Sequence, residues 1–73
     1  MAELRNRLKD FRVARGLTQE GLARAVGVTR QTIIAIEKEK FVPSTRLALQ
    51  LARALNVAFG ELFSLEEGKG RRS

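Results

Sequence analysis

The sequence predicts a small all-α domain, because its apolar residues follow helical spacing and its glycines and proline divide it into short segments. Apolar side chains recur every three or four residues, which is the spacing of one helix face. Breaks fall at Gly16, Gly27, Pro43 and Gly60. A chain of 73 residues has room for a single small core. We therefore predict a compact five-helix bundle forming one domain over residues 1–67, with a basic tail at 68–73.

The first three predicted helices are short, and start and stop signals bound each of them. Thr18 and Thr29 can cap helix starts by accepting hydrogen bonds from free backbone N–H groups. Gly16 and Gly27 suit the left-handed residue that ends a helix. These signals predict helices over Asn6–Arg15, Gln19–Val26 and Arg30–Lys38.

The fourth predicted helix is the clearest, because five apolar residues form one face of it. Ser44 can cap its start, and Asn56 tolerates the left-handed conformation at its end. Its apolar face contains Leu47, Ala48, Leu51, Ala52 and Leu55. One further short helical turn is expected around Phe59, Leu62 and Phe63.

The composition excludes several classes of protein. Without Cys or His, the chain lacks disulfides, thiolate and imidazole metal ligands, and the side chain that most often acts as a general base. No enzyme activity, cofactor or metal is therefore expected. No apolar run approaches the roughly 20 residues that span a membrane, and no signal peptide opens the chain, so a cytoplasmic location is predicted.

The charge balance favours a polyanionic partner. Fourteen Lys and Arg residues against eight acidic ones give a net charge of +6 at pH 7. Such an excess promotes binding to nucleic acids through counterion release. Charge alone does not separate this interpretation from a basic, soluble surface.

Residues 19–38 carry the strongest functional signal, since two short helices joined by a tight glycine turn form a helix-turn-helix unit. Ala23 is small where the helices must approach, and Gly27 lies where a positive φ is needed. In such a unit the second helix enters the major groove of DNA.

Five motifs occur in order along the run LTQEGLARAVGVTRQTIIAIEKEKFVPSTRLALQLARALNV: TQEGLA, the Gly27 turn, TRQTI, IE and PS. In this combination the chain resembles the Cro/C1-type (XRE family) helix-turn-helix regulators of phages, bacteria and archaea, from about Leu4 to Phe63. The resemblance implies a lambda repressor-like fold in a small stand-alone regulator. It also implies a homodimer on double-stranded DNA at a near-palindromic operator, most often as a repressor. An antitoxin-type protein-interaction module with a protein partner, or an RNA-binding adaptor, is the alternative.

The resemblance implies that Arg30 and Gln31, at the start of the third predicted helix, reach base edges, and these two residues point away from its buried stripe together with Ile34 and Ala35. Arg can pair bidentately with guanine and Gln with adenine, so both types suit direct readout. The competing interpretation is that both are solvated polar residues after a cap. The predicted base-reading residues are Arg30, Gln31, Ile34 and Ala35.

Phosphate contacts are expected around this helix. The resemblance implies one at the start of the second helix, and the free N–H groups opening the fourth helix also suit a phosphate. The two lysines after the third helix suit phosphates too, unless they are simply a solvated loop. The threonines can either cap or contact phosphate, and capping is favoured for Thr29. The predicted phosphate-binding residues are Gln19, Thr29, Thr32, Lys38, Lys40, Ser44 and Thr45.

The resemblance also implies a structural ion pair between Arg12 and Glu37, which would orient the third helix. One position departs from the family pattern: Glu39 stands where Gly or Asn is usual. A left-handed turn there would cost roughly 1 kcal/mol or be resolved by another geometry.

The segment from Phe59 to Leu65 holds more apolar side chains than a small bundle readily buries, which favours a dimer interface. The predicted interface residues are Phe59, Leu62, Phe63 and Leu65. Related regulators with a similar ending can instead form a strand there, which would pair Ala2–Leu4 with Leu62–Glu66. Phe63 and Leu65 could equally be ordinary core residues.

Overall fold

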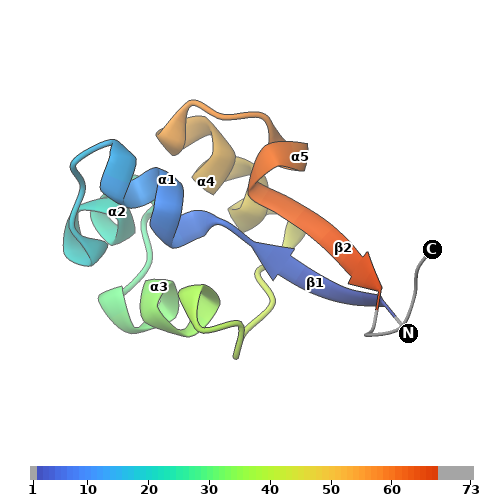
Figure 1. Cartoon of the computed structure of the whole chain (residues 1–73). Coiled ribbons are helices and arrows are strands. Elements are labelled where there is room, and N and C mark those ends of the chain that lie inside the picture. Colours follow the sequence, from blue (N-terminus) through green and yellow to red (C-terminus); the bar gives the residue numbers. More distant parts are fainter. Residues whose placement is uncertain (1, 68–73) are drawn as a thin grey trace.

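The computed structural model describes residues 2–67, which form five helices and one two-stranded sheet (Figure 1). The elements in chain order are β1 (Ala2–Asn6), α1 (Leu8–Ala14), α2 (Gln19–Val26), α3 (Arg30–Glu37), α4 (Thr45–Leu55), α5 (Phe59–Leu62) and β2 (Phe63–Glu67). The five predicted helices are therefore present. The predicted tail at 68–73 lies outside the described residues.

Side-chain caps set the starts of three helices. The hydroxyls of Thr18, Thr29 and Ser44 accept hydrogen bonds from the backbone N–H groups of Gly21, Thr32 and Leu47, respectively. These starts agree with the sequence prediction. The start of α1 does not, because Asn6 belongs to β1, and its side-chain oxygen accepts a hydrogen bond from the N–H of Leu8 at 3.0 Å.

The helices α1 to α4 end in the same way, with one residue in the left-handed conformation just beyond the helix. Gly16, Gly27 and Asn56 take this role after α1, α2 and α4, as their residue types predict. After α3 the residue is Glu39, with φ 61. The left-handed turn thus forms at Glu39 despite its side chain.

The strand pairing that the sequence analysis left open is present: a small antiparallel sheet joins the two ends of the described chain, so the fold is mostly helical rather than all-α. Ala2 lies opposite Glu67 and Asn6 opposite Phe63. The pairing extends beyond the predicted Ala2–Leu4, and β2 starts one residue later than predicted because Leu62 closes α5. Figure 1 shows the sheet projecting from one end of the helices.

The core lies between the helices and includes the first residue of β2. Helix α2 packs against both α3 and α4, and α5 packs against α4 and β2. The fully buried large side chains are Leu8, Leu22, Ile33, Ile36, Leu51, Leu55 and Leu62. Among residues 2–67, none of the helices is long and apolar enough to cross a membrane.

Candidate nucleic-acid interface

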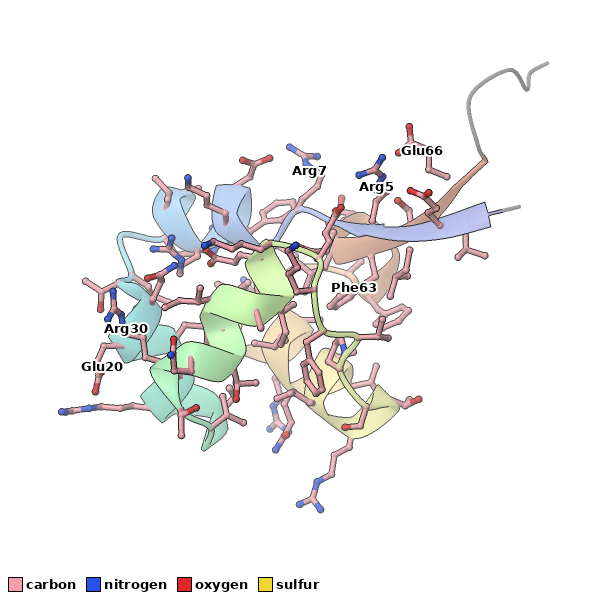
Figure 2. All side chains as sticks on the ribbon, turned by 90° about the horizontal axis from the view of Figure 1, so that it is seen from below. Arg5, Arg7, Glu20, Arg30, Phe63 and Glu66 are labelled. Atoms are coloured by element: carbon pink, nitrogen blue, oxygen red, sulfur yellow. The ribbon has the colours of Figure 1, made fainter. Side chains whose placement is uncertain are left out.

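The helices α2 and α3 form the two-helix unit that the sequence predicts. They pack directly against each other, and Ala23 of α2 is buried. Gly27 turns the chain between them with φ 77. Figure 2, which views the molecule from below, has α3 in the foreground.

The exposed and buried residues of α3 lie on different faces. Ile33 and Ile36 are fully buried and anchor the helix to the core. Arg30 and Gln31, in the first turn, are exposed, while Ile34 and Ala35 are half-buried beside them. Arg30 extends outward from the start of α3 in Figure 2. An exposed Arg and Gln at the start of a helix that lies at the surface can hydrogen-bond to base edges.

The polar residues that flank α3 divide into capping and free groups. Thr29 accepts a hydrogen bond from the N–H of Thr32 at 3.3 Å, and Ser44 accepts one from the N–H of Leu47 at 3.1 Å, so both hydroxyls act as caps. Thr29 and Thr32 also share a hydroxyl hydrogen bond of 3.2 Å. Three further predicted phosphate-binding residues, Lys38, Lys40 and Thr45, are exposed.

Gln19 is half-buried and turned toward the end of α3. Its amide Nε2 donates a hydrogen bond of 3.2 Å to Oε1 of Glu37. If Gln19 contacts a phosphate, the same side chain also holds the end of α3. The sequence analysis did not anticipate this second role.

The Arg12 and Glu37 side chains form an ion pair between α1 and α3 that is almost completely shielded from solvent. Arg12 Nε lies 2.6 Å from Glu37 Oε2, and the two side chains are 10% and 6% exposed. Arg12 Nη1 also donates to the backbone oxygen of Leu17 at 2.8 Å. Together with Gln19, these bonds satisfy both charged groups and link α1, α2 and α3.

Comparison with known proteins identifies the arrangement. The helix-turn-helix family model matches residues 8–62. The chain belongs to the helix-turn-helix family. This agrees with the XRE-type resemblance, and the protein is a transcriptional regulator with a helix-turn-helix DNA-binding domain. Both strands of the sheet lie outside the matched residues.

Similar proteins occur in archaea and bacteria. An uncharacterized HTH-type transcriptional regulator of Methanothermobacter thermautotrophicus is 51% identical over 65 residues, covering 88% of this chain and 94% of that protein. Another, from Methanocaldococcus jannaschii, is 47% identical over 64 residues, covering 88% and 97%. The restriction-modification controller protein C.AhdI from Aeromonas hydrophila has a similar structure, with a TM-score of 0.71 and 36% identity over 75% of this chain and 80% of that one.

Two residues that contact the end of the helix-turn-helix unit were missed by the sequence analysis. Arg5 Nη1 lies 2.8 Å from Oε1 of Glu39, and the side-chain amide Nδ2 of Asn6 donates to the backbone oxygen of Ile36 at 3.0 Å. The available signal was Glu39 itself, since an acidic residue in a position that favours glycine requires compensating contacts.

The predicted dimer-interface residues do not form one surface. Leu62 is fully buried and Phe63 is 4% exposed, so both belong to the core of the single chain. For Phe63 this is the alternative that the sequence analysis left open, whereas Leu62 was expected at the interface and is instead buried by its own chain. Phe59 and Leu65 remain available, at 45% and 72% exposed. The ring of Phe59 packs on that of Phe63 with centroids 5.5 Å apart, so the core supports this exposed ring.

Proposed function

We propose that this helix-turn-helix regulator binds a near-palindromic operator as a homodimer and represses transcription by blocking access to the promoter. The observation that carries the proposal is the pair of exposed residues Arg30 and Gln31 in the first turn of α3. The two neighbouring side chains supply donors and an acceptor suited to guanine and adenine in the major groove.

The residues around α3 support binding to the DNA backbone. Lys38 and Lys40 are exposed just beyond the helix, and α4 opens nearby with exposed Ser44 and Thr45. Lysines and the N-terminus of a helix both attract phosphate groups, which fix the register of a protein on the duplex. In this proposal, Ile34 and Ala35 supply apolar contacts to bases next to those that Arg30 and Gln31 read.

A dimer is proposed because one short recognition helix reads only a few base pairs. Two copies related by a two-fold axis would place their α3 helices in successive major grooves, about 34 Å apart. Phe59 and Leu65 are the predicted interface residues that the chain leaves exposed. Burial of apolar side chains of this size against a second copy would stabilise the dimer.

Selection of bound duplexes from a random pool tests sequence-specific binding directly. We expect an enriched pair of inverted half-sites whose centres lie about 10 base pairs apart. Transcription from a promoter overlapping the selected site should fall when the protein is added. No enrichment from the pool, or preferential binding of RNA, would contradict the proposal.

The dimer gives a separate prediction. Leu65→Ser should weaken self-association at least about tenfold, because each copy loses the burial of one large apolar side chain. Light scattering at micromolar concentration measures the change against a wild-type mass twice the 8.2 kDa of one chain. Leu49→Ser is the matched control, since Leu49 is another exposed leucine, on α4, and is 52% exposed. A wild-type protein that stays monomeric with and without operator would rule out the dimer.

A further inference from the structure

The end of α3 is held in a conformation that its sequence disfavours. The N–H of Glu39 donates to the oxygen of Ile36, and that of Lys40 to the oxygen of Ala35, both at 2.9 Å. These two bonds define a left-handed helix end, where glycine is the usual residue. Glu39 occupies it with φ 61, so contacts made by its side chain must compensate for the strain.

The compensating contacts come from β1. One carboxylate oxygen of Glu39 lies 2.8 Å from Arg5 Nη1, and the other accepts a hydrogen bond of 3.4 Å from the N–H of Asn6. The Asn6 side chain donates to the oxygen of Ile36 in the last turn of α3. Strand β1 therefore fixes both the last turn of α3 and Glu39, the second residue beyond that helix.

Arg5 is itself held in place by the sheet. Its Nε lies 2.8 Å from Glu66 Oε1 on the neighbouring strand, and Figure 2 shows the two side chains close together on one face of the sheet. The hydrogen bond to Glu39 and the charge of that carboxylate raise the pKa of Arg5, with a further contribution from Glu66. The Arg5 guanidinium therefore bridges the Glu39 and Glu66 carboxylates.

We propose that Glu39 is a positioning residue for DNA binding, which Arg5 and Asn6 hold so that the loop after α3 presents Lys38 and Lys40 to the phosphates. The inference rests on the phosphate role proposed for these two lysines. It assigns the terminal sheet, which lies outside the residues matched by the family model, a direct part in shaping the DNA-binding surface.

Whether removal of Glu39 raises or lowers the affinity for DNA distinguishes a positioning role from a purely electrostatic one. An acidic side chain beside a DNA-binding loop repels phosphates, so removing it should tighten binding if charge alone matters. If Glu39 instead positions the loop, removing its carboxylate should weaken binding. Glu39→Gly is the sharpest variant, because glycine keeps the left-handed turn without strain while losing the contacts with β1.

The experiment measures operator affinity over a salt series together with thermal unfolding. For Glu39→Gly we expect affinity to fall about two- to fivefold, the size expected of an exposed ion pair, while the melting temperature is unchanged or raised. A purely structural role would lower both together. Asp10→Asn is the matched control, because it also removes one negative charge and breaks an exposed ion pair, the one with Arg7, without changing a partner of Arg5 or the loop, and its affinity should stay within about twofold.

Arg5→Gln provides a second test that leaves the backbone of the loop unchanged. If Arg5 acts through Glu39, the double variant with Glu39→Gly should bind no more weakly than Arg5→Gln alone. The proposal would be overturned if the losses of affinity in the two single variants added up in the double variant. Wild-type or tighter binding by Glu39→Gly would overturn it as well. Failure of the lysine role is distinguishable, because Lys38→Ala and Lys40→Ala would then leave both affinity and its salt dependence unchanged.

Discussion

Arg12→Met is expected to lower the free energy of unfolding by about 3 to 5 kcal/mol, because it leaves the buried Glu37 carboxylate without its charged partner. For a domain of this size, the melting temperature should fall by about 12 °C or more. DNA binding should weaken as well, since Glu37 terminates α3. Calorimetry and operator titration measure the two effects.

Replacing both Arg12 and Glu37 should lower the melting temperature less than replacing either one alone. The variant carrying Arg12→Met and Glu37→Met removes both charges at once, so neither remains buried and unpaired. Arg24→Met is the matched control, because the Arg24–Glu20 pair on α2 is exposed and should contribute at most about 0.5 kcal/mol. Unchanged melting temperatures for both single variants at Arg12 and Glu37 would show that the ion pair is not needed.

Substitutions in the first turn of α3 should have the largest effect on DNA recognition. Arg30→Ala and Gln31→Ala should each cost about 1 to 3 kcal/mol on the selected operator, the value of one bidentate base contact. Both variants should also reduce the difference in affinity between the operator and a random duplex. Gln31→Ala should leave the salt dependence nearly unaltered, because it removes no positive charge.

The lysine variants provide the contrast. Lys38→Ala and Lys40→Ala should weaken binding to operator and random duplex about equally, because phosphate contacts carry no sequence information. Each should also reduce the slope of log K against log salt by about 0.9, the counterion release of one phosphate contact. If Gln31→Ala weakened both duplexes equally while a lysine variant changed the sequence preference, the assignment of α3 to base reading would be wrong.

The sequence by itself determined the features that depend on local chemistry. Thr18, Thr29 and Ser44 cap helices because their hydroxyls reach N–H groups three residues ahead, which any chain with that spacing can achieve. Gly27 and the apolar spacing around it were enough to predict α2, the turn and α3. The five helices followed from such local signals, and the helix-turn-helix family from the resemblance of the motifs between Leu17 and Val57.

Only the tertiary structure decided which side chains meet across the chain. Leu62 and Phe63 have the composition of an interface, but packing places them in the core, because burial depends on what covers a residue and not on its type. The contact between Arg5 and Glu39 joins residues 34 positions apart, a separation that no local pattern can register. The sheet brings them together by pairing the two ends of the described chain, and this pairing is what lets an acidic residue hold a turn that favours glycine.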